Sequence, residues 1–157
     1  MQTETNRLEE QLRKAMEGDA WHGDALLQVL AGVTAEQAAA RPIPGAHSIW
    51  ELALHLCGTF GLVLRRLNGD GRQLSPDEDW PAIPEPSAEN WAETLYELRR
   101  LNDELRQAVL RFPAERLDDP LVPDPDYTAY TQFIGITQHN LYHAGQIALL
   151  RKALLHA

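Results

Sequence analysis

The sequence contains a single cysteine, Cys57, among its 157 residues. One cysteine excludes an internal disulfide and is typical of a reducing compartment. No apolar run is long enough to span a bilayer. The first residues, MQTETNRLEEQLRK, lack the apolar core and the small-residue cleavage site of a secretory signal. These absences predict a cytoplasmic protein with no membrane-spanning segment.

Positive charge is also scarce. The chain has 14 Lys and Arg against 23 Asp and Glu, which gives a formal net charge of −9. Proteins that bind nucleic acid or anionic membranes usually present a basic face. The stretch LRRL occurs twice, each time on a segment that also carries acids, and no basic tract stands out. We therefore expect neither nucleic acid nor a membrane as a partner.

The composition that remains, 44% hydrophobic and 24% charged, is that of one soluble globular domain covering residues 1–157. Apolar residues recur at helical spacing in four segments, and no segment alternates long enough to predict a strand. Four amphipathic helices predict an all-α four-helix bundle. The segments cover about 6–32, 48–68, 88–112 and 128 to the C-terminus.

Local signals mark several helix ends. Ser48 followed by Glu51 is a capping-box pattern that predicts a helix start. Pro113 predicts the end of the third helix. Gly18 and Gly23 weaken the middle of the first helix, although its apolar period continues beyond them.

Two connections are long for a bundle and rich in proline and acids, residues 68–86 and 113–127. They also carry the aromatic residues Trp80 and Tyr127. Connections of this length are often functional or disordered. We expect both of them to cap one end of the bundle.

The last helix contains HNLYHAGQI, residues 139–147, with His139 and His143 four positions apart. At about 100° per residue, both histidines fall on the sector that must face the core. That sector, aligned on Ile136, contains Gln132, His139, His143, Ile147, Leu150 and Leu154. The two histidines are therefore predicted to point inward.

A buried imidazole needs partners for both of its nitrogens. A divalent metal supplies one to each ring, and two histidines four apart on a helix can converge on one ion. The second helix adds an inward His55 with Glu51 one turn earlier, and the first adds Asp19 and His22. Inward ionisable residues on three of the four helices favour a metal site.

Plainer interpretations exist for the same residues. A lone His-x-x-x-His pair is more often two surface or satisfied core histidines, and without a metal the rings would pair with polar groups such as Gln132 or Thr59. Cys57 lies about 200° around its helix from His55 and is interpreted as a packing residue. The other residues singled out are interpreted as loop or tail residues (His47, His156) and as bundle packing (Trp21, Trp50).

Two stretches resemble a known family. AWHGDALLQVLAGVTAEQAAARPIPGAHSIWELALHL is similar to the first two helices, and HNLYHAGQIALLRK to the last-helix signature, of the DinB-like (YfiT-type) superfamily of bacterial metalloproteins. The resemblance covers nearly the whole chain except the Pro-rich loops. It implies an up-down-down-up four-helix bundle, a frequent homodimer, and a divalent metal, most often zinc or nickel, held by His55, His139 and His143.

Three protein ligands leave an open coordination position, which is typical of catalytic sites. The resemblance favours transfer of a low-molecular-weight thiol such as bacillithiol or mycothiol to a small-molecule substrate. A metal-dependent hydrolase using a bound water, with a pKa near about 7, and a non-catalytic metal-stabilised binding module are the alternatives. No general base is assigned; Glu51, His22 and Asp19 are the candidates, and we hypothesise that His22 lines the pocket.

Overall fold

The computed structural model describes residues 2–155 and contains no strand within them, so the all-α prediction is confirmed. Its elements are α1 (Glu4–Glu17), α2 (Leu26–Leu30), α3 (Ala35–Ala39), α4 (Ile49–Leu67), α5 (Pro76–Asp79), α6 (Ala88–Arg111), the 3₁₀ turn η1 (Ala114–Arg116) and α7 (Ala129–Leu154). No helix of this described part is long and apolar enough to cross a membrane. The expectation for His156 falls outside the described residues.

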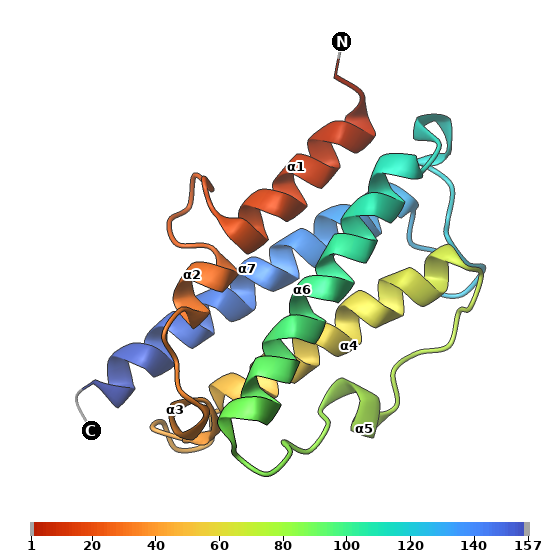
Figure 1. Ribbon diagram of the computed structural model, residues 1–157. Helices are drawn as coiled ribbons and strands as arrows, with labels where there is room; N and C mark the ends of the chain where they lie inside the picture. The colour runs from red at the N-terminus through yellow and green to blue at the C-terminus, as the bar shows by residue number, and fades with distance from the viewer. Residues whose placement is uncertain (1, 156–157) are drawn as a thin grey trace.

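Four helices are long, and each packs on two of the others, in the order α1, α6, α4, α7 and back to α1 (Figure 1). The starts of α4 and α6 lie side by side. A hydrogen bond of 3.0 Å shows this, in which Trp50 Nε1, near the start of α4, donates to Thr94 Oγ1, near the start of α6. The end of α6 meets the start of α7, where Phe112 and Phe133 pack edge to face. Helices α4 and α6 therefore run in one direction, and α7 returns in the other.

The core lies between these four helices. Its largest fully buried side chains include Leu12, Trp50, Phe60, Leu98, Leu105, Phe133 and Ile147. The predicted start of α4 is confirmed, since Ser48 Oγ accepts from the Glu51 N–H and Glu51 Oε2 accepts from the Ser48 N–H at 2.7 Å. Ser87 and Thr128 cap α6 and α7 by one side-chain bond each, accepting from the N–H groups of Asn90 and Thr131, without the reciprocal bond.

The prediction of one continuous helix over residues 6–32 is wrong beyond residue 17. Helix α1 ends at Glu17, and the chain then turns through two positive φ angles, 141° at Gly18 and 59° at Asp19. A left-handed turn is open to glycine and tolerated by aspartate, and it cannot continue a right-handed helix. Trp21, expected to pack in the core, is consequently fully exposed, with a relative accessibility of 102%.

The connection 68–86 does not cap an end of the bundle. Because α4 and α6 are parallel, this segment must return along the length of the molecule, and it folds α5 against the side of α4 on the way (Figure 1). The contact is close at Gly58, where an added Cβ would lie 2.7 Å from the carbonyl oxygen of Glu78. The connection 113–127 joins the adjacent ends of α6 and α7.

Candidate metal centre

Three histidines meet where α4 packs on α7. His55 comes from α4, and His139 and His143 come from successive turns of α7. One nitrogen of each ring lies within 4.8 Å of the others. The Nε2 atom of His139 is 3.1 Å from Nε2 of His55 and 3.1 Å from Nε2 of His143. The structure thus brings together the three histidines that the sequence selected.

The outward nitrogens of two of these rings have fixed acceptors. Nδ1 of His55 lies 2.8 Å from the backbone oxygen of Asp79 and 3.0 Å from its Oδ1. Nδ1 of His143 lies 2.6 Å from Oε1 of Gln146. An oxygen acceptor places the ring proton on Nδ1. Both rings therefore turn the lone pair of Nε2 toward the centre of the cluster.

Without a cation, the cluster cannot satisfy its nitrogens. His139 carries one ring proton when neutral, so its Nε2 can donate to only one of the two facing Nε2 atoms. Its Nδ1 is buried and has no hydrogen-bond partner within residues 2–155. A divalent metal bound by three imidazoles uses all three converging lone pairs. The donor set of His55, His139 and His143 fits such an ion.

The electrostatics keep the rings of His139 and His143 neutral, as metal ligation requires. Burial, together with the nearby His143 and His55 rings, lowers the pKa of His139 to about 4. Burial also lowers the pKa of His143 below its ordinary value, against the opposing effect of its hydrogen bond with Gln146. At neutral pH both rings therefore hold a free lone pair.

Residues outside the two ligand helices orient the cluster. Trp80, directly after α5, stacks on His55 with ring centroids 4.1 Å apart, and on His47 with centroids 3.7 Å apart. Asp79 and Trp80 together hold the His55 ring in place. The interpretation of His47 as a loop residue agrees with its position before α4, but the stacking was not foreseen.

Asp79, Trp80 and Gln146 support the cluster, although no sequence pattern predicted that role. Gln146 follows His143 by three residues, a spacing that makes neighbours on a helix surface and could have indicated the contact. Asp79 and Trp80 belong to the connection 68–86, whose length, acids and aromatic residue were noted but gave no sign that it lies against His55.

Within the described residues, no hydrogen bond or ion pair joins a candidate general base to the three histidines. Glu51 is held by the Ser48 cap and by an ion pair with Arg41. Asp19 and His22 lie in the segment between α1 and α2 and are exposed. The expectation that these two face inward is wrong, because α1 has ended before them. Neither lines a cavity that borders the histidines.

Other polar residues near the cluster are engaged without the histidines. Gln132 accepts from Arg66 and donates to the carbonyl of Tyr127, and the Thr59 hydroxyl donates to the carbonyl of Leu56. Neither is a histidine partner, as the metal-free alternative had supposed. Cys57 lines a separate cavity beside α5, and burial raises the pKa of its thiol to about 12.

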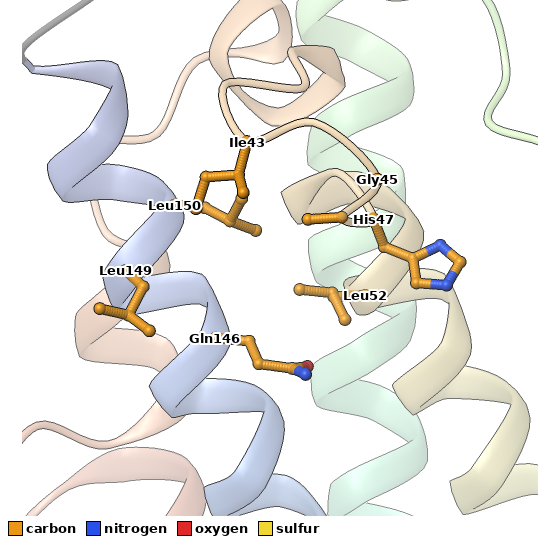
Figure 2. Close-up of a pocket in the computed structure, with 8 residues that line it drawn as sticks. Ile43, Gly45, His47, Leu52, Gln146, Leu149 and Leu150 are labelled. Atoms are coloured by element: carbon orange, nitrogen blue, oxygen red, sulfur yellow. The ribbon is translucent and has the colours of Figure 1, made fainter.

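Two cavities approach the cluster from opposite ends of the α4–α7 contact. One, of about 330 Å³, has Gln146 and His47 on its wall (Figure 2); it is lined by Ile43, Gly45, Ala46, His47, Leu52, Gln146, Leu149 and Leu150. The other, of about 290 Å³, includes His139 itself in its lining. A small molecule in the second cavity would touch the cluster directly.

No curated protein and no solved structure matches the chain. A family model of the DinB superfamily does match, over residues 19–147. The match spans α4 and α6, the segment that carries α5, and most of α7, and it includes all three histidines. The chain belongs to the DinB superfamily.

Proposed function

We propose that this protein is a metal-dependent enzyme that transfers a small-molecule thiol to an electrophilic substrate. One observation carries the proposal: three Nε2 lone pairs converge, and two of the rings are locked in that tautomer by Asp79 and Gln146. His55, His139 and His143 would hold the ion. An all-imidazole set suits zinc, nickel, iron or copper, and the resemblance to the family favours zinc or nickel. When bound, the ion supplies a Lewis acid with an open position for an external ligand.

The chain's own residues favour thiol transfer over hydrolysis. A thiol is deprotonated outright when it coordinates a divalent metal, whereas a metal-bound water keeps a pKa near about 7 and gains more from a nearby base. Asp79 already accepts the proton of His55, and Glu51 is tied to Arg41. Cys57 faces another cavity and stays protonated, so the thiol must come from a cosubstrate. Its sulfur would bond to an electrophilic carbon as the bond from that carbon to a leaving group such as halide breaks; the leaving group departs with the bonding electrons, and the thiol proton goes to solvent.

The first test is the metal content of protein purified without an affinity tag, measured by mass spectrometry. We expect about one divalent ion per chain, as for a single three-histidine site, and none in the His55→Ala/His143→Ala double variant. His22→Ala, which removes an exposed histidine, should keep the metal. No ion in the native protein, with equal thermal stability of the double variant, would overturn the proposal.

The second test is chemical. Loss of free thiol is followed with bacillithiol, mycothiol and an aromatic electrophile such as 1-chloro-2,4-dinitrobenzene. Metal-dependent thiol loss supports transfer. Hydrolysis of activated esters without thiol would point to the hydrolase, and unfolding on chelation without either activity to a structural role.

Three further expectations belong to the same proposal. The up-down-down-up order of the family's bundle is supported by the helix directions in Figure 1. The homodimer and the cytoplasmic location stay predictions. Light scattering on purified protein tests the first of these two, and cell fractionation tests the second.

A further inference from the structure

Arg66, near the end of α4, is buried without an opposing carboxylate. Only 7% of the residue is accessible to solvent, and no acidic side chain among residues 2–155 forms an ion pair with it. Its neighbour Arg65, by contrast, pairs with Glu78 at 3.0 Å. Buried charges in proteins are normally paired, because removal from water is costly. Arg66 is therefore an exception that needs an explanation.

The partners of Arg66 are neutral amides. Its Nη1 donates to Oε1 of Gln132 at 3.0 Å, and its Nη2 donates to Oε1 of Gln73 at 2.9 Å. Its Nε is buried and has no partner within the described chain. Guanidinium has five N–H donors, so several remain for another acceptor. The two amides orient the side chain but leave its charge unneutralised.

Arg66 lines the same cavity of about 290 Å³ that His139 lines. Gln132, which contacts Arg66, precedes His139 by two turns of α7, so the two ends of the cavity are about 10 Å apart along the helix. Between them the wall is mainly apolar, with Leu62, Val63 and Ile136. The cavity thus has a cationic end, an apolar middle and an end at the histidine cluster.

Gly135 lies in the wall of this cavity, and no neighbouring atom requires a glycine there. Gly135 lies inside α7, where glycine weakens a helix. A Cβ added there would meet no atom within 4 Å, so no neighbour requires its small size. Its lack of a side chain instead leaves space in a wall that Arg66 and Thr131 also line.

We propose that this cavity binds an elongated small molecule whose anionic head group pairs with Arg66 and whose apolar body extends toward His139. The guanidinium fork suits a carboxylate or a phosphate. A span of about 10 Å corresponds to an extended chain of about six carbons with a reactive end group. The placement of that end at the histidines rests on the proposed function, whereas the anion site at Arg66 does not.

The probes are hexanoate, its neutral isostere hexanamide, and hexyl phosphate, titrated by calorimetry into the full-length protein as purified. Hexanoate should bind at least about tenfold more tightly than hexanamide, and Arg66→Gln should remove that difference. Arg72→Gln removes the same charge from an exposed arginine paired with Asp70 and should change nothing. Melting temperatures show whether each variant is folded.

A second variant leaves the arginine intact. Gly135→Leu fills the cavity without altering Arg66, and it should abolish hexanoate binding while the helix stays folded. Tighter binding of hexyl phosphate than of hexanoate keeps the site and identifies phosphate as its ligand. Equal binding of hexanoate by native protein and Arg66→Gln, or no binding of either anion, overturns the proposal.

Two further binding measurements separate the anion site at Arg66 from the proposed metal-dependent activity. The His55→Ala/His143→Ala variant should still bind hexanoate, because the anion contacts Arg66 rather than a metal; loss of binding there overturns the anion site at Arg66. In zinc-loaded protein, 6-mercaptohexanoate should bind more tightly than hexanoate, since its sulfur reaches the ion. Equal binding of these two would overturn the placement of the reactive end at His139.

Discussion

The indole ring of Trp80 lies parallel to the imidazole ring of His55, with the ring planes 1° apart and the centroids 4.1 Å apart. His47 stacks on the same indole at 3.7 Å and 7°, so Trp80 is sandwiched between two imidazoles. A metal-ligand candidate on α4 is thus oriented by a residue from the connection 68–86. Contacts of this kind fix ligand rings and commonly change metal affinity about 10- to 100-fold.

Trp80→Leu should therefore weaken metal binding by about tenfold, because the His55 ring gains freedom to rotate. The dissociation constant is measured by competition with a chromophoric chelator. Trp21→Leu is the matched control, since Trp21 is fully exposed, and it should leave the constant unchanged. Unaltered affinity in Trp80→Leu would mean that the stacking does not orient the ligand.

Two glycines of α4 test the role of α5. In Gly58→Ala the new Cβ would lie 2.7 Å from the Glu78 carbonyl oxygen, so α5 must shift and the Asp79 contact to His55 is disturbed. We expect metal affinity to fall about tenfold. In Gly61→Ala the Cβ meets no atom within 4 Å, so stability should rise by up to about 1 kcal/mol with metal affinity unchanged. Urea unfolding and chelator competition measure both quantities, and equal effects of the two substitutions would refute this account.

The hydrogen bond from His143 to Gln146 is tested by two substitutions of one residue. Gln146→Leu removes the acceptor and should lower metal affinity by about tenfold or more. Gln146→Glu keeps an acceptor oxygen and adds a negative charge, so metal affinity should be equal or higher. Metal titrations at fixed pH measure both. A Glu variant that binds as weakly as the Leu variant would show that Gln146 does not set the tautomer of His143.

The metal-free protein should lose stability as the pH falls from about 6.5 toward about 4. The pKa of His139 in the folded protein, about 4, lies below its ordinary value, so the unfolded chain binds more protons in this range. The free energy of unfolding should fall by up to about 1 kcal/mol per pH unit from this residue. Urea midpoints at pH 7 and pH 5 measure the slope, and His139→Gln should show a shallower one. Equal slopes would contradict the burial of a neutral ring.

Much of the helical framework follows from local sequence. Ser48 and Glu51 place the start of α4, and the apolar stripes predict α6 and α7 close to their observed bounds. The wrong prediction for the first helix also has a local cause, the backbone turn directly after Glu17. The apolar period continues beyond Gly18, but the left-handed turn at Gly18 and Asp19 outweighs it.

Local sequence patterns suffice to predict α4, α6 and α7 and the inward direction of His55, His139 and His143, because side-chain direction follows from helical geometry at fixed spacing. What surrounds those histidines is set by the way the helices pack. The contact of Asp79 with His55 spans 24 positions and the Arg66–Gln132 bond spans 66. Such contacts depend on the direction in which whole helices pack, and parallel α4 and α6 force the connection between them across the site. No local pattern encodes that path, so the supports of the metal centre and the cationic end of its cavity became visible only in the folded chain.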